Sequence, residues 1–323
     1  MNTSFNTHIV AITLVGLSAL GCAGESDIFD DVESMGEIAM NGDDGDDDDD
    51  GGEDGQPERA DGGGGEDEGG LELEPCVAVD LLFVVDNSDT MAEEQAKLLA
   101  GAGAFISDSA ALLPADIDFH IGVVTTDSAD LVRHDLQGVD CNFFSEQGLP
   151  FMTHAGAMNT SLDTGLGCAA VVGVAGSPDE RPIEMALSAL GPGANLPEGA
   201  NPGFVRDDAV LVLVLLTDEE DDHETVTGWG SAGEPQDWSD ELIELVGGVE
   251  ERAVILSLVG HDKPNACPGF QWDGKDGAEL APRLVEFTQG FTHGVVGDVC
   301  ASSYADFFAQ AAVEVAGACG VAG

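Results

Sequence analysis

The sequence predicts an α/β fold: a doubly wound, mostly parallel sheet with one antiparallel edge strand and helices on both faces, preceded by a disordered acidic tail. Apolar runs alternate with helical segments after Pro75, as in parallel sheets that helices cover on both faces. Residues 210–216 are seven consecutive aliphatic residues, which predict a central strand with no water-exposed face. Residues 23–75 contain no comparable run and are rich in Asp, Glu and Gly.

The elements expected after the tail fall within residues 76–323, which we predict to form one domain with inserted loops. A hairpin partner at residues 131–133 is expected to add the antiparallel edge to the second strand. A long Gly-rich insertion then leads to the central strand. The expected strands lie at residues 80–85, 118–125, 209–216, 253–259 and 294–296, and the expected helices at residues 91–107, 181–190, 239–246, 280–287 and 304–316.

The acidic tail accounts for much of the charge of the chain. Residues 23–75 carry 22 acidic residues against Arg59 alone, so this segment is expected to be a disordered and extended tether. The whole chain of 323 residues has nine Lys and Arg against 63 Asp and Glu, a formal charge of -54. Phosphate backbones and anionic lipids repel such a surface, which excludes nucleic acid as a partner. The 43% apolar content still leaves material for one sizeable core.

The first 22 residues have the features of an export signal. They contain no acidic residue, and residues 9–20 form an apolar stretch too short to span a bilayer. Residues 18–22 resemble a bacterial lipobox, which implies that Cys22 is lipidated and becomes the mature N-terminus. Cleavage of an ordinary signal peptide near Ala23 is the alternative. Both possibilities predict an exported protein of the bacterial cell envelope. The lipobox also predicts that a lipid anchor, in the outer membrane or at the cell surface, is the only contact of the protein with a membrane.

The cysteine count also indicates export. Without Cys22 the chain has six cysteines, an even number that suits disulfides in an oxidising compartment. No two of them have CxxC spacing, which disfavours a zinc site or a thioredoxin-like redox role. Six cysteines allow 15 connectivities, and loop placement favours Cys141 with Cys168, Cys267 with Cys300, and Cys76 with Cys319 across the domain ends.

A turn rich in oxygen ligands follows the first strand. Asp86, Ser88 and Thr90 recur at alternate positions, so their side chains can converge on one point if the turn is extended. A carboxylate and two hydroxyls are hard ligands that suit a Mg²⁺ ion which keeps some waters and one open position. Asp218 follows the central strand, whose carboxyl end lies at the sheet edge where α/β proteins bind ligands.

These residues resemble the metal-ion-dependent adhesion site of the von Willebrand factor A (vWA) family. Asp86, Ser88, Thr90 and Asp218 match its pattern, and the strands ending in LLFVVD, HIGVVT and LLTD match the surrounding words. The resemblance covers about the last 245 residues. It implies a Rossmann-like vWA fold and a non-enzymatic adhesion module that binds a protein, peptide or glycan through Mg²⁺, or through Ca²⁺ or Mn²⁺.

Three features depart from the family pattern. Asp89 stands where the family usually has Gly, and residues 218–224 hold six carboxylates where the usual turn is less charged. The loop Thr of the family is missing. Ser177, Asp179 or Glu180 can supply an oxygen in its place, and we predict that Glu180 does so.

Two other functions stay open on the sequence. The first is an acidic scaffold that binds cations through its tail and surface, with a vestigial metal site. The second is a metal-dependent hydrolase that uses His223, His261 or His293 near the strand ends. No HExxH or paired-His spacing supports the hydrolase.

Overall fold

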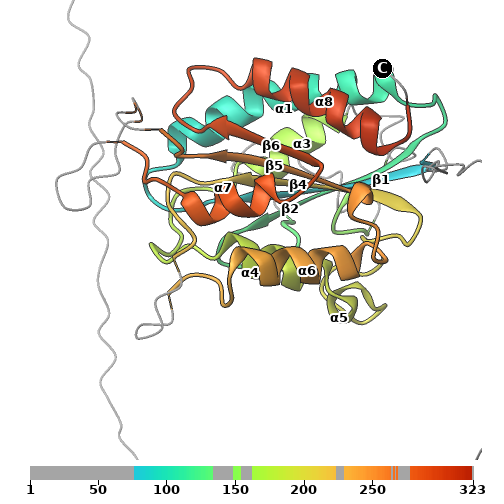
Figure 1. Ribbon diagram of the computed structural model, residues 1–323, viewed down its shortest axis with the longest axis horizontal. Helices are drawn as coiled ribbons and strands as arrows, with labels where there is room; N and C mark the ends of the chain where they lie inside the picture. Colours follow the sequence, from blue (N-terminus) through green and yellow to red (C-terminus); the bar gives the residue numbers. More distant parts are fainter. Residues whose placement is uncertain are drawn as a thin grey trace, which may run out of the picture. The chain divides into compact units, whose positions relative to one another are not determined.

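A six-stranded sheet forms the centre of the fold, with its strands in the order β3-β2-β1-β4-β5-β6 (Figure 1). The computed structural model describes residues 76–133, 148–153, 162–222, 229–262, 265, 267 and 277–321, of which residues 162–164 and 168 are described by their backbone alone. The strands are β1 (Ala78–Val85), β2 (Asp118–Thr125), β3 (Met152–Thr153), β4 (Ala209–Leu216), β5 (Ala253–Val259) and β6 (His293–Asp298). All pairings are parallel except that of β2 with β3, which confirms the predicted fold class.

Helices cover both faces of the sheet (Figure 1). One layer consists of α1 (Ala92–Leu112), α3 (Leu162–Ala170) and α8 (Ala305–Ala318). The other consists of α4 (Pro182–Leu190), α6 (Pro235–Leu245) and α7 (Pro282–Gln289). Two short elements, α5 (Pro192–Asn195) and the 3₁₀ helix η2 (Glu250–Arg252), complete the described part. The sequence indicated five of these helices and missed α3, α5 and η2.

The alternation of side chains along each strand feeds two separate cores. In β1, Phe83 and Val85 pack with α1 and α8, whereas Leu82 and Val84 pack with α4 and α6. All eight residues of β4 are buried. A strand covered on both faces needs apolar residues at every position, which explains the uninterrupted aliphatic run.

The antiparallel edge strand differs from the prediction. Met152 and Thr153 pair with β2, and residues 131–133 do not form a strand. The backbone N–H of Leu131 donates to Oδ1 of Asn201 at 2.9 Å. This N–H is therefore bound to a side chain and not to the backbone of a neighbouring strand. The Leu131 side chain packs over Gly122, where an added Cβ would lie 2.5 Å from Leu131 Cδ2. One backbone hydrogen bond, from the N–H of Val132 to the carbonyl oxygen of Val123 at 2.7 Å, joins the segment to β2, and the Asn201 and Leu131 side chains fix the rest of it.

Two of the three predicted disulfides are confirmed. Cys76 pairs with Cys319, which joins the start of β1 to the end of α8, and Cys267 pairs with Cys300. The predicted partners Cys141 and Cys168 lie outside the described side chains, as does Cys22 with the tail and the proposed signal. Among the helices that the structure describes, none is long and apolar enough to cross a membrane.

Candidate metal centre

The predicted ligands lie at the carboxyl ends of two neighbouring strands. Asp86 follows β1 directly, and Asp218 follows β4 after one residue; β1 and β4 pair along their whole length. The N–H of Asp86 donates to the carbonyl oxygen of Leu216 at 3.0 Å, which holds the two strand ends together. In the sheet, β2 lies on one side of β1 and β4 on the other, so the direction in which the chain adds strands reverses at β1. Such a reversal point is where open α/β sheets bind ligands.

A chain of hydrogen bonds connects the four residues that match the adhesion-site pattern. The N–H of Ser88 donates to Oδ1 of Asp86 at 2.7 Å. The hydroxyls of Ser88 and Thr90 are 3.3 Å apart, and the Thr90 hydroxyl donates to Oδ1 of Asp218 at 3.2 Å. Asp86, Ser88 and Asp218 are buried. These hydrogen bonds bring the two hydroxyls of the turn together with the carboxylates of Asp86 and Asp218.

Two residues that the sequence did not single out fix Asp86. Thr217 donates its hydroxyl proton to Oδ2 of Asp86 at 2.7 Å. Gln95, buried in α1, donates to the carbonyl oxygens of Asp86 and Gly173, each at 2.8 Å. Thr217 stands between the central strand and Asp218, and Gln95 stands one turn into the helix after the turn. The signal available in the sequence was that Thr217 and Gln95 are polar residues close to the predicted ligands.

Among the three candidates in the third loop, Glu180 is the one whose pKa is raised by burial and by the charge of Asp86. Its side chain is buried, with the Thr126 side chain acting on its carboxylate. The other two candidates are engaged within the loop. The Ser177 hydroxyl accepts from the N–H of Asp179 at 3.0 Å, and Oδ1 of Asp179 accepts from the N–H of Gly230 at 2.9 Å. Glu180 stays the predicted ligand from this loop.

The loop before Glu180 is held against the Asp86 turn. The N–H of Gly176 donates to the carbonyl oxygen of Asn87 at 2.7 Å, and an added Cβ on Gly176 would lie 2.5 Å from Cγ of Asn87. Oδ2 of Asp127 accepts from Nδ2 of Asn87 at 3.1 Å and from the N–H of Ser177 at 2.9 Å. The Thr126 hydroxyl donates to Oδ1 of Asn87 at 3.2 Å. These contacts join the ends of β1 and β2 to the loop.

The acidic run that begins at Asp218 has divided roles. Glu220 accepts from the N–H groups of Arg283 and Leu284 and thereby caps α7. Asp221 accepts from the N–H of Ile183 at 3.1 Å and from the Ser231 hydroxyl at 2.7 Å, which fixes the start of α4. These two carboxylates support helices and are not free for a metal. The end of the run, from His223, lies outside the described residues.

Four carboxylates remain at the site without a basic partner. Burial raises the pKa of Asp86 to about 6, and burial together with the charge of Asp86 raises that of Asp218 to about 7, of Glu219 to about 8 and of Glu180 to about 10. No ion pair to these four occurs within the described part of the chain. By contrast, the buried Asp80 at the other end of β1 accepts from the Arg206 guanidinium at 2.8 Å.

This arrangement fits a divalent cation. A buried carboxylate without a partner is costly unless a proton or a cation neutralises it, and one oxygen of Asp218 lacks a hydrogen bond among the described groups. Carboxylate and hydroxyl oxygens are the ligands that Mg²⁺ and Ca²⁺ prefer. In the described ranges no three His, Cys, Asp or Glu side chains are arranged to hold a metal by themselves. The hydroxyls of Ser88 and Thr90 are therefore needed in any such set.

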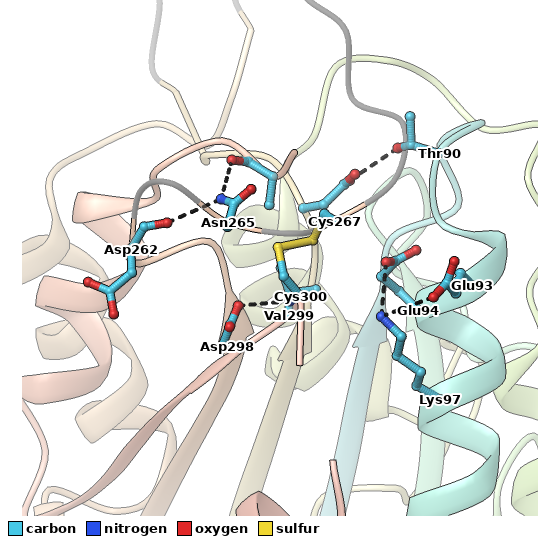
Figure 2. Close-up of a disulfide and its surroundings, with 12 residues drawn as sticks. Thr90, Glu93, Glu94, Lys97, Asp262, Asn265, Cys267, Asp298, Val299 and Cys300 are labelled. Atoms are coloured by element: carbon cyan, nitrogen blue, oxygen red, sulfur yellow. Dashed lines mark hydrogen bonds and ion pairs between the residues drawn. A yellow bond between two sulfur atoms is a disulfide. The ribbon is translucent and has the colours of Figure 1, made fainter. Parts of the chain in front are cut away.

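The Cys267–Cys300 disulfide lies at the same edge of the sheet. Figure 2 shows Cys267 beside Thr90, with Glu94 and Lys97 below them on α1. Glu94 is buried, and the Lys97 ammonium lies 3.5 Å from its Oε1. The charge of Glu94 contributes to the raised pKa of Asp218. The disulfide thus borders the wall of the site that Thr90 and α1 form.

The histidines offered as catalytic residues are engaged elsewhere. Nδ1 of His293 lies 3.0 Å from Oε2 of Glu314 on α8, and Nδ1 of His261 lies 3.3 Å from Oδ2 of Asp262. Neither has a hydrogen bond or ion pair to the carboxylates at the end of β1 and β4 in the described contacts. His223 lies outside the described residues.

Comparison with known proteins gives a faint structural likeness. No protein family model matches the chain, and no curated protein matches it. Proximal thread matrix protein 1 from the mussel byssus is similar at a TM-score of 0.39 and 12% identity, over 75% of this chain and 49% of that one. The pilus adhesin SpaC from Lactobacillus rhamnosus GG gives 0.37 and 13%, over 76% and 30%, and the PilB minor pilin from Streptococcus sanguinis gives 0.37 and 12%, over 77% and 63%.

One further structure of the mussel protein has a zinc-occupied MIDAS (metal-ion-dependent adhesion site) motif. It gives a TM-score of 0.39 and 13% identity over 75% of this chain and 48% of that one. This chain spans less than two thirds of the length of each of these proteins. Values this low carry no conclusion about the site. The topology of this chain is established by its own strand pairings.

Proposed function

We propose that this chain is a non-enzymatic binding module of the vWA type, which captures a protein, peptide or glycan through a divalent metal ion. The observation that carries the proposal is the hydrogen-bonded chain from Asp86 through Ser88 and Thr90 to Asp218, gathered at the ends of two adjacent strands. Buried carboxylates without basic partners, at the reversal point of the sheet, are a suitable place for a cation.

Each residue has a distinct task in this proposal. Ser88 and Thr90 offer hydroxyl oxygens to the ion, and Asp86 and Asp218 offer charge, either directly or through bound water. Glu180 adds a carboxylate from the third loop. Once bound, the ion supplies a positive charge that can accept an oxygen from a partner. Thr217 and Gln95 hold Asp86 in place by the contacts described above.

The display of this module follows from the proposed signal and tail. Export, lipidation of Cys22 and an acidic tether would place the domain at the bacterial cell envelope, with reach set by the tether. The two disulfides suit an oxidising compartment. The charge of -54 disfavours nucleic acid and anionic lipids as partners.

A single titration experiment tests the metal site. Mg²⁺, Ca²⁺, Mn²⁺ and Zn²⁺ are titrated by calorimetry into the full chain, into its Asp86→Ala variant and into a control variant, Asp108→Ala. Asp108 is exposed near the far end of α1, about 24 Å along the helix from its first residue. We expect one site with a stoichiometry near one in the wild type and in Asp108→Ala. The Asp86→Ala variant should retain only the weak binding of the tail.

The result separates the three functions. Equal, weak and multiple binding in all three proteins would favour the acidic scaffold, which the charge of -54 makes the second candidate. A single site that also survives Asp86→Ala would mean that the ion binds elsewhere. The hydrolase would require turnover of a substrate in the presence of the metal, which the binding module does not predict.

A further inference from the structure

We infer that the outer edge of β6 is a docking site for an extended, basic segment of a partner protein, which pairs with β6 as a seventh strand of the sheet. Three features carry this inference: the backbone of β6, an apolar hollow beside it, and the carboxylates around it. The docking site includes none of the residues of the proposed metal centre, and the pairing requires no metal ion.

The strand β6 is the open edge of the sheet. It pairs with β5 on one side, and among the strands that the structure describes none pairs with its other side. Short strands, charged side chains and prolines protect the edges of sheets from pairing with other chains. The opposite edge strand, β3, has only two residues. By contrast, β6 has six residues, and the four between His293 and Asp298 are uncharged and include no proline.

The backbone groups of Val296 point to this open side. Residues of a strand turn their N–H and C=O groups alternately to the two sides. The N–H of Val299, just after β6, donates to the carbonyl oxygen of Val259 in β5 at 3.1 Å, so the odd-numbered residues of β6 turn toward β5. Val296 therefore turns its N–H and C=O outwards, where an added strand can bond to both.

An apolar hollow of about 520 Å³ lies beside Val296. Val296 lines it together with Val285 of α7 and with Leu280, which is 43% exposed. Val296 packs with the core on the α7 side of the sheet. In an added strand, the side chain opposite Val296 would lie on this same face. An apolar side chain at that position would fill the hollow and cover Leu280.

Carboxylates around the edge define the charge of the partner. Asp298 ends β6, Glu286 is exposed on α7, and Glu250 accepts from the Thr292 hydroxyl at 2.9 Å just before the strand. None of the three has an ion pair within the described part of the chain. A second copy of this chain, with its charge of -54, would be repelled, whereas a segment with Lys or Arg would be attracted.

A synthetic peptide tests the docking site. The probe is a fluorescein-labelled peptide, Thr-Lys-Thr-Leu-Thr-Lys-Thr, and its binding to the full chain is measured by fluorescence anisotropy at about 0.15 M salt, which screens exposed charges. We expect the same affinity in chelator and in calcium. Methylation of the backbone nitrogens of alternate residues should abolish binding for one of the two alternations only, because an added strand turns one of its edges to β6.

Variants of the chain locate the bound probe. Val296→Pro removes the outward N–H and leaves the bonds to β5 intact, since an edge strand tolerates proline where the N–H faces outwards. We expect it to bind the probe about 10-fold more weakly, and Val296→Thr, which keeps the N–H, to bind more tightly than Val296→Pro. Leu280→Ser should also weaken binding, whereas Leu196→Ser should not. Leu196 is a leucine of similar exposure, 51%, that follows α5.

Thermal unfolding followed by circular dichroism shows whether each variant is folded, and Leu280→Ser and the methylated peptides decide the question if Val296→Pro does not fold. Three results would overturn the inference: no binding of the probe to the wild type, equal binding to all the variants, or tolerance of both methylation patterns. Equal binding would mean that the probe is held by acidic residues elsewhere. A dimer in sedimentation velocity that Val296→Pro abolishes would also overturn it, because a second copy would then occupy the edge.

Discussion

Without divalent metal ions, the folded domain is expected to lose stability as the pH rises from about 5 to 8. Burial raises the pKa of Asp86 to about 6, of Asp218 to about 7 and of Glu219 to about 8, above their ordinary values of 3.8 to 4.5. A raised pKa means that the folded state binds the proton more tightly than the unfolded state does. The stability that these protons provide is complete below pH 4 and is lost as the pH passes the raised values.

The expected effect is large because several groups act in the same direction. Each pKa unit corresponds to about 1.4 kcal/mol, so Asp86 alone accounts for about 3 kcal/mol. A bound divalent ion replaces the protons and stabilises the ionised form. Calcium or magnesium should therefore raise the free energy of unfolding at pH 8 much more than at pH 5.

Urea unfolding of the full chain at pH 5 and pH 8, in chelator and in calcium, measures this effect. Buried Asp80, whose pKa is raised to about 6 by burial, adds to the loss with pH but lies away from the metal site. Calcium should not reverse its share. The Asp86→Asn variant should lose stability less steeply with pH and respond less to calcium. Metal-free stability that increases between pH 5 and pH 8 would contradict the assignment of these carboxylates as a buried, unneutralised group.

Removal of the Cys76–Cys319 disulfide is expected to lower the free energy of unfolding by about 5 kcal/mol. The bond closes a loop of 243 residues, and the entropy that a crosslink removes from the unfolded chain grows with loop length. It joins the start of β1 to the end of α8, where the N–H of Cys76 also donates to the carbonyl oxygen of Cys319 at 3.3 Å. Loss of the bond should free both ends of the domain.

The Cys76→Ala/Cys319→Ala double variant is compared with Cys267→Ala/Cys300→Ala in chemical unfolding. The second bond closes only 33 residues, so its removal should cost about 2 kcal/mol less. It borders Thr90, so its loss should also weaken metal binding, whereas the terminal bond should not affect the metal site (Figure 2). Equal stability of the terminal double variant and the wild type would show that strand pairing alone holds the domain ends.

The sequence determined the fold class and the five parallel strands because each is encoded by local pattern. The strands β4 and β5 begin and end where their apolar runs do, since a strand covered on both faces is apolar at nearly every position. The Asp86 turn was also visible, because alternate side chains of an extended turn face one way. Cysteine parity and loop placement gave the two pairings that the structure describes.

Only the tertiary structure decided which groups complete the site. Thr217 lies 131 residues from Asp86 in sequence, and Asp127 lies 50 residues from Ser177, yet each pair is joined by a hydrogen bond once the strand order sets β1 between β2 and β4. Tertiary contacts also distinguish Glu180, which is buried, from Ser177 and Asp179, which accept hydrogen bonds from backbone N–H groups. They likewise assign Glu220 and Asp221 to helix ends and give the sheet edge to Met152 and Thr153. Contacts between segments far apart in the sequence depend on packing, so a local pattern of residues does not predict them.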